Sequence, residues 1–219
     1  MAKLKTFFID PQRCIGCRSC MAACRECDSH KGMSMIYVDY IDRPTSTVTL
    51  PSVCMHCVDP VCAEVCPADA IKVGPDGVVH MAMTERCLYC RNCVYACPFG
   101  IPKFEPEQHL QYKCNMCYDR TAFGKAPMCA TVCPSGALTY GEYSEVTETR
   151  GGKPINVFNF GDQQVETRVF LMAPANSEVD VLEVDDQAEY YDDYSTSSPL
   201  NFIEEALAAR SRNDGSSEN

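Results

Sequence analysis

Residues 87–98 read CLYCRNCVYACP, and this stretch decides the fold. Three cysteines are spaced two residues apart, a fourth follows after three more residues, and a proline comes next. The two-residue gaps hold the first three thiols on one tight loop and turn several backbone N–H groups inward. The fourth thiol lies on the opening turn of a predicted short helix and points elsewhere. It is therefore expected to serve a different centre from the first three.

A frame of this kind recurs four times, which marks an internal repeat. Three of the frames end in proline, and the first has Arg25 at that place. Cys27 lies just beyond the first frame, and no cysteine follows Cys133, so the cysteine-bearing body is expected to end near residue 145. Sixteen of the 17 cysteines belong to the frames: Cys14, Cys17, Cys20 and Cys24; Cys54, Cys57, Cys62 and Cys66; Cys87, Cys90, Cys93 and Cys97; Cys114, Cys117, Cys129 and Cys133.

The composition narrows the class of protein. A polypeptide of 219 residues is long enough for one or two domains with a buried core. The net charge of −11 is concentrated in residues 178–219, which hold twelve acidic and two basic residues. The rest is close to neutral, so no nucleic acid partner is expected. We find no secretory or twin-arginine signal and no apolar run of about 18 residues, so no membrane span is expected.

Regular structure is expected to be sparse. The sequence predicts short helices over 20–24 and 62–66 and strands over 36–41 and 46–50. Two segments rich in β-branched and aromatic residues, 154–160 and 163–172, predict a hairpin around Gly161-Asp162. This hairpin either covers the body or offers an edge to a partner. The acidic segment after residue 184 is predicted to be largely irregular, with one short helix near 199–210.

The cysteine spacing favours iron–sulfur clusters. In two-cluster ferredoxins the fourth cysteine of a frame binds the other cluster, and the frame ends in proline. Four frames then work in two pairs and hold four clusters through sixteen thiolates, which leaves Cys27 as the spare cysteine. Structural zinc sites instead pair two Cys-x2-Cys knuckles about 12–20 residues apart. An odd number of cysteines without a secretion signal argues against a disulfide framework.

Three stretches carry a resemblance to a known family. They are residues 14–20 (CIGCRSC), 54–62 (CMHCVDPVC) and 114–120 (CNMCYDR). These stretches resemble the four-cluster iron–sulfur (beta, electron-transfer) subunits of the dimethyl sulfoxide reductase, polysulfide reductase and formate dehydrogenase family of molybdopterin oxidoreductases. The resemblance covers about residues 5–145. It implies an α+β fold of two bacterial-ferredoxin-like (dicluster) modules, one nested within the other, with a C-terminal β-hairpin and an acidic tail.

The resemblance also implies module boundaries and ligands. The outer module would comprise residues 1–45 and 109–145, the inserted module 46–108, the hairpin extension 146–184 and the tail 185–219. The implied ligand sets are Cys14, Cys17, Cys20 and Cys133 (set 1); Cys24, Cys114, Cys117 and Cys129 (set 2); Cys54, Cys57, Cys62 and Cys97 (set 3); and Cys66, Cys87, Cys90 and Cys93 (set 4). Nitrate reductase beta subunits carry tryptophan at the second cysteine of the third frame. This sequence has Cys90 there, so four [4Fe–4S] clusters are expected.

The function that the resemblance implies is a non-catalytic relay for single electrons. Its partners would be a molybdopterin-containing catalytic subunit and a second redox partner, such as a membrane quinol-binding subunit, a Rieske or cytochrome carrier, or a soluble donor. The alternatives are an electron-transfer subunit of a hydrogenase or other redox complex, and a structural zinc-binding interaction module. A cytoplasmic location is expected, with periplasmic location by co-export with a signal-bearing partner as the alternative.

Three features outside the ligand sets carry hypotheses. The eleven residues between Cys117 and Cys129 form a loop that breaks the usual spacing, and we expect it to meet the larger catalytic subunit. Cationic side chains near the ligands, Lys113 among them, either tune cluster potentials or are ordinary solvated surface groups. His56 lies between Cys54 and Cys57 and either tunes a cluster or has a structural role.

Overall fold

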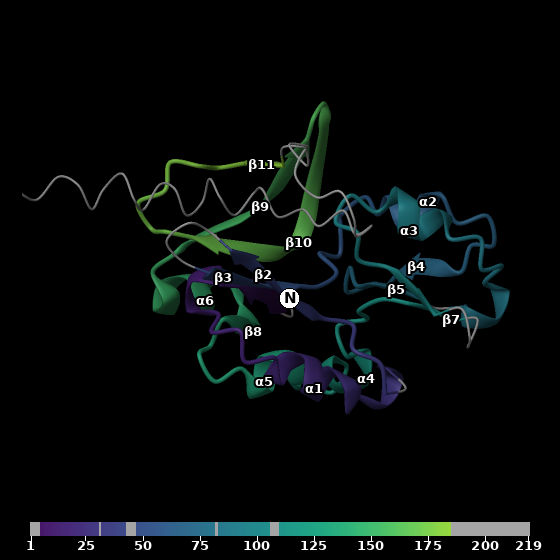
Figure 1. The fold of residues 1–219 in the computed structure, drawn as a ribbon, viewed down its shortest axis with the longest axis horizontal. Helices are drawn as coiled ribbons and strands as arrows, with labels where there is room; N and C mark the ends of the chain where they lie inside the picture. The colour runs from purple at the N-terminus through teal and green to yellow at the C-terminus, as the bar shows by residue number, and fades with distance from the viewer. Residues whose placement is uncertain (1–4, 31, 43–46, 82, 106–109, 185–219) are drawn as a thin grey trace, which may run out of the picture.

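The structure is a computed structural model that describes residues 5–30, 32–42, 47–81, 83–105 and 110–184. Figure 1 shows a central sheet with two lobes beside it, one containing α1, α4 and α5 and the other containing α2, α3, β4 and β5. The acidic tail and the helix expected near 199–210 lie outside the described residues. Within the described part of the protein, no helix has the length and apolar character needed to cross a bilayer.

The largest regular unit is a five-stranded sheet of order β11–β9–β10–β1–β8. Its strands are β1 (Lys5–Ile9), β8 (Leu138–Glu142), β9 (Lys153–Phe160), β10 (Gln163–Ala173) and β11 (Leu182–Val184). β9 and β10 are antiparallel neighbours separated by Gly161-Asp162. β1 runs parallel to β10 and antiparallel to β8, so that Phe7 faces Val169 on one side and Tyr140 on the other. The first and last described parts of the protein therefore share one sheet.

Successive side chains of a strand point to opposite faces of the sheet, and at the end of β1 the side chains on both faces are buried. Phe7 and Ile9 join the main core with Phe158, which is fully buried. Phe8 points the other way and packs with Val146 of α6 (Tyr143–Arg150). The helix α6 thus covers one face of the sheet, and the cysteine-bearing lobes cover the other.

The lobe nearest β1 is built from segments far apart in the sequence. α1 packs against α5, and α4 lies against the short 3-10 turn η2. The elements of this part are η1 (Pro11–Arg13), α1 (Ser19–Arg25), η2 (Asp28–His30), α4 (Tyr118–Thr121) and α5 (Met128–Val132), with the antiparallel pair β2 (Tyr37–Asp42) and β3 (Thr47–Ser52) beside them. The predicted helix over 20–24 and the two predicted strands are confirmed, with bounds shifted by one or two residues. The expected position of the fourth cysteine on the opening turn of a helix is wrong, because Cys24 lies in the last turn of α1 and Cys133 directly follows α5.

The second lobe comes from one continuous stretch of sequence. Its elements are α2 (Val61–Glu64), β4 (Ile71–Val73), β5 (Val79–Met81), η3 (Thr84–Arg86), α3 (Asn92–Ala96), β6 (Lys103–Glu105) and β7 (Leu110–Tyr112). α2 packs on α3, and Ile71 and Val79 form a small core with Cys62 and Cys93.

The hairpin of β9 and β10 holds this second lobe in place. Phe99 meets Phe158 and Phe160 edge-on, with ring centroids 5.2 and 5.1 Å apart. A single β-bridge also joins Cys57 to Thr167 of β10. These contacts agree with a covering role for the hairpin.

Candidate metal centres

Each of the four cysteine loops contains a residue in the left-handed backbone conformation. The φ angle is 59° at Arg18, 46° at His56, 56° at Tyr89 and 56° at Met116. Such a conformation costs about 1–3 kcal/mol for a residue other than glycine, and it persists only where the surroundings impose it. Left-handed residues let successive N–H groups converge into a concave nest, which many iron–sulfur sites use. The recurrence of this backbone indicates an anionic centre at each loop.

All four cysteines of set 1 line one cavity, together with Ile15 and Pro134. Burial is the main cause that raises the pKa of Cys20 to about 11, and the negative charges of the other three set-1 cysteines add to it. Cys17 is exposed, and its pKa is lowered by the hydrogen bond with the Ser19 hydroxyl, 3.4 Å away. Set 1 therefore has one solvent-facing thiol.

Set 2 is the most buried of the four. Its cysteines are all buried, and they line a cavity together with His30 and with Cys54 of set 3. Burial is the main cause that raises the pKa of Cys114 to about 12. Burial also raises the pKa of Cys129, and the charges of the other three set-2 cysteines add to that rise.

Sets 3 and 4 gather in the second lobe. Burial, followed by the charges of the other three set-3 cysteines, raises the pKa of Cys57 to about 12. The four cysteines of set 4 line one cavity with Leu88 and Arg91. Burial, followed by the charges of its three set partners, raises the pKa of Cys93 to about 11. Cys90 is the exposed member of set 4.

These groupings fit [4Fe–4S] clusters. Four thiols converge in each set, and thiolates are the ligands that iron–sulfur clusters take. Burial and mutual repulsion oppose deprotonation of these thiols, so a bound cationic metal would relieve both. In the second cysteine loop, Nδ1 of His56 accepts the N–H of Val79 at 3.0 Å. The buried Nε2 of His56 has no hydrogen-bond partner among the described residues, as expected where an acceptor belongs to a bound group.

Lys113 supplies a buried cation between sets 2 and 3. The residue is 5% exposed, and its ammonium donates hydrogen bonds to the carbonyl oxygens of Val79 and Cys114. Burial raises the pKa of Cys62 and of Cys114, and the Lys113 charge opposes that rise in both cases. Lys113 is therefore not a solvated surface group, which leaves tuning of the cluster potentials as the remaining hypothesis for its charge.

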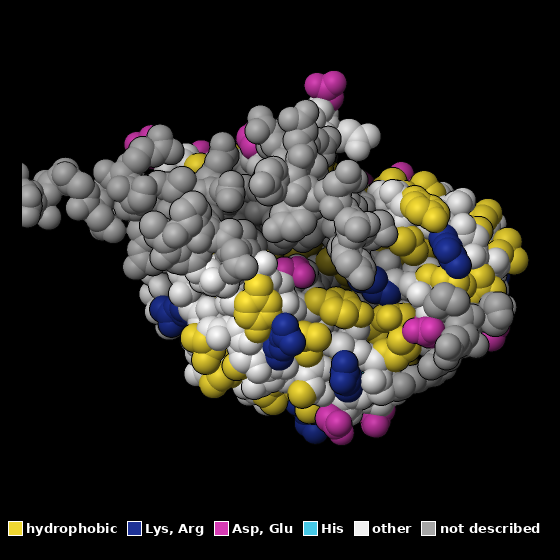
Figure 2. Space-filling model, viewed as in Figure 1, with side chains coloured by type: hydrophobic (Ala, Val, Ile, Leu, Met, Phe, Trp, Pro, Cys, Tyr) yellow, Lys and Arg dark blue, Asp and Glu magenta, His cyan; other side chains and the backbone are white. Residues whose placement is uncertain are grey.

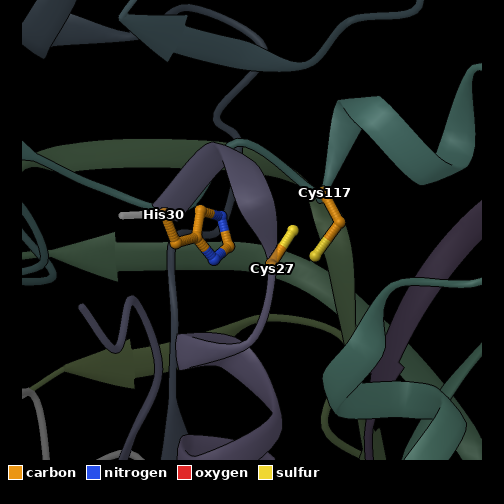
Figure 3. A group of neighbouring side chains, drawn as sticks. All are labelled: Cys27, His30 and Cys117. Carbon is orange, nitrogen blue, oxygen red and sulfur yellow. The ribbon is translucent and has the colours of Figure 1, made fainter. Parts of the chain in front are cut away.

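Cys27 lies beside set 2. Its Sγ is 3.3 Å from Oδ1 of Asp119 and 3.4 Å from the Ser29 hydroxyl. Figure 3 shows Cys27 and Cys117 with their sulfur atoms directed toward each other and His30 close by; the ligand atoms of these three residues lie within 4.8 Å of one another. Cys27 is not among the residues that line the described set 2 cavity, whereas Cys117 and His30 are.

His30 is the site residue that sequence reasoning missed. It lies on η2, outside every cysteine frame, so no spacing signal marks it. Burial acts to lower its pKa, but the hydrogen bond with Cys24 and the charge of Cys24 outweigh burial and raise the pKa to about 9.

Comparisons with known proteins agree with this chemistry. A 4Fe-4S dicluster domain matches residues 45–143, and a 4Fe-4S binding domain matches residues 5–26. Together with the converging thiols, these matches define the molecule as an iron–sulfur protein of the 4Fe–4S ferredoxin type.

The relatives are subunits of larger enzymes. The sequence is 35% identical over 158 residues to a subunit of the anaerobic dimethyl sulfoxide reductase of Escherichia coli (strain K12), covering 66% of this protein and 77% of that subunit. It is 34% identical over 155 residues to the formate dehydrogenase-O iron-sulfur subunit of the same strain, covering 61% and 51%. It therefore spans about half the length of the latter relative. This protein belongs to the family of iron–sulfur subunits that contains these two relatives, and the resemblance seen in the sequence is confirmed.

Proposed function

We propose that this protein is a non-catalytic relay that carries single electrons through four [4Fe–4S] clusters. The clusters would pass electrons between a molybdopterin-containing catalytic subunit and a second redox partner. Sets 1 to 4 are the proposed ligands, one set for each cluster. The observation that carries the proposal is that each set combines cysteines of one loop with a cysteine from another part of the sequence.

The proposed path runs from set 1 through sets 2 and 3 to set 4. For each pair of neighbouring sets, the charge of a cysteine in one set raises the pKa of a cysteine in the other. Burial is the largest cause of the raised pKa in each case. Cys20 of set 1 acts on Cys129 of set 2. Cys54 of set 3 acts on Cys114 of set 2. Cys93 of set 4 acts on Cys62 of set 3. Neighbouring sets therefore lie close enough to interact electrostatically, and an electron relay requires such short separations between its clusters.

The two ends of this path are the proposed docking places. Cys17 of set 1 and Cys90 of set 4 are exposed. Ile15 and Leu88, in the same two loops, are 66% and 65% exposed. Figure 2 shows hydrophobic side chains gathered over the lobe that carries α2 and α3, with a basic side chain among them. Exposed apolar surface beside a redox centre suits a protein partner.

The segment between Cys117 and Cys129 is a further proposed contact with the catalytic subunit. It contains α4, and its Phe123 is 81% exposed. The Lys5 ammonium donates a 3.1 Å hydrogen bond to the Gly124 carbonyl, which ties the segment to the start of β1. Because the Phe123 side chain is exposed, it does not contribute to the core of this protein and is available for contact with a partner.

We also propose the nested arrangement of modules. Residues 1–45 and 109–145 would form the outer module with sets 1 and 2, and residues 46–108 the inserted module with sets 3 and 4. The antiparallel pairs β2–β3 and β6–β7 would then each join the two modules across a boundary. The support for this arrangement is that α1 packs on α5 in one lobe and α2 packs on α3 in the other. The four-cluster count and this division are tested together by the ligand variants below.

The test is metal analysis with electron paramagnetic resonance (EPR) on the full-length protein purified without oxygen. We expect about 16 iron and about 16 acid-labile sulfide atoms per molecule and four reducible clusters. Cys17→Ser and Cys133→Ser should alter the same EPR component, because both residues are proposed ligands of one cluster. Cys27→Ser is the matched control, because Cys27 is not a proposed ligand, and it should leave the set 1 component and the iron content unchanged. A colourless protein that holds zinc would overturn the relay.

A further inference from the structure

His30 links the two segments that supply set 2. Its Nδ1 lies 2.9 Å from the carbonyl oxygen and 3.2 Å from Sγ of Cys24. Its Nε2 lies 2.7 Å from Oδ1 of Asn115, and the same oxygen accepts the N–H of Cys117 at 2.9 Å. A continuous series of hydrogen bonds thus runs from Cys24 through His30 and Asn115 to Cys117.

The acceptors around the ring decide where its protons are. A carbonyl oxygen only accepts, so Nδ1 must carry a proton, and this one N–H is shared between the carbonyl oxygen and Sγ of Cys24. Oδ1 of Asn115 is fixed as the acceptor by the N–H of Cys117, so Nε2 must carry a proton as well. A histidine that donates from both nitrogens is an imidazolium cation. His30 therefore places a positive charge, 2% exposed, on the wall of the set 2 cavity.

We propose that His30 is a positioning residue that raises the reduction potential of the cluster held by set 2, through its charged hydrogen bond to Cys24. This inference rests on the proposed ligand role of Cys24. Reduction adds one electron, and so one negative charge, to a cluster surrounded by thiolates. A fixed cation that donates to a ligand sulfur favours the more negative state, because charge-assisted hydrogen bonds in buried sites are the strong ones.

The effect should be confined to one cluster. His30 bonds one thiol, and that thiol belongs to set 2. The backbone N–H of Met35 also donates to Sγ of Cys24 at 3.2 Å, so the sulfur keeps a donor when the imidazole is removed. Replacement of His30 therefore removes charge from the site and leaves part of the support of the ligand in place.

The experiment measures the midpoint potentials of all clusters in the full-length protein, by EPR-monitored reductive titration. Cys129→Ser identifies the component of set 2. In His30→Leu and His30→Gln we expect the equilibrium constant for reduction of that cluster to fall by roughly tenfold or more. For one electron this lowers the midpoint potential by about 59 mV or more. His80→Gln is the matched control, because within the described residues His80 donates to no cysteine and its ring packs near Tyr118. It should leave the midpoint of the set 2 component in place.

The outcomes separate this inference from the proposed function. An unchanged set 2 midpoint in both His30 variants overturns the role of His30, and so does an equal shift of every component. If His30→Leu loses iron, His30→Gln decides, and loss of iron in both also overturns a tuning role. If Cys24→Ser leaves the set 2 component unaltered, the ligand assignment is wrong instead.

Discussion

Replacement of Lys113 tests whether a buried charge sets the potentials of the two inner clusters. The ammonium lies 3.0 Å from the carbonyl oxygen of Cys114. The oxygen and the sulfur of one cysteine are at most roughly 4.5 Å apart, given standard bond lengths. The Lys113 charge is therefore within about 7.5 Å of a proposed set 2 ligand, and it also acts on the set 3 thiols of Cys62 and Cys97.

Coulomb's law gives the size of the effect. Two unit charges about 7.5 Å apart interact by about 2 kcal/mol at an effective dielectric constant of roughly 20. For one electron this corresponds to about 90 mV, since a tenfold change is about 1.4 kcal/mol or 59 mV. We expect Lys113→Met to lower the midpoints of the set 2 and set 3 clusters by about this amount. The midpoints of sets 1 and 4 should change less.

The assay is the same EPR-monitored titration, with iron content measured on each sample. Lys113→Arg keeps the charge and should keep the potentials. Lys153→Met is a second control, because Lys153 pairs with Asp180 at 2.7 Å at the surface of β9. Unchanged inner midpoints in Lys113→Met, with the iron retained, would refute the reasoning.

Three further predictions rest on burial and thiol chemistry. Cys27→Ser should keep about 16 iron atoms per molecule, whereas Cys129→Ser should lose iron from one cluster; equal iron contents would contradict the ligand sets. Phe158→Ala should destabilise the protein by about 3–5 kcal/mol in denaturant unfolding, because Phe158 is fully buried against Phe99, and a loss below about 1 kcal/mol would show that the hairpin does not support the second lobe. The iron-free protein should melt at a lower temperature as the pH rises from 9.0 toward 11. Burial raises the pKa of Cys20 from 9.0, its value in the unfolded protein, to about 11 in the folded protein. In this pH range the unfolded state loses a proton that the folded state keeps, so the free energy of unfolding falls. A melting temperature independent of pH over that range would contradict this cause.

The sequence by itself determined the chemistry of the body. The spacing of cysteines in each frame is local, so it predicts a tight loop and a following short helix without knowledge of distant contacts. The same frames indicated iron–sulfur clusters and the family. Alternating β-branched and aromatic residues on either side of Gly161-Asp162 predicted the pair of strands that became β9 and β10.

Only the tertiary structure decided how these parts meet. β10 pairs with β1, a strand more than 150 residues earlier, and no local pattern specifies a partner at that distance. The helix α6 was not predicted, because just Val146 among its residues is buried and its pattern is weak. The sequence left two roles open for Lys113, a tuning charge or a solvated surface group, and it gave no signal for His30; folding buries both residues beside thiols. Burial and charge at a site depend on which distant segments surround it, so the three-dimensional contacts decided against a surface role for Lys113 and made His30 a candidate for tuning a cluster.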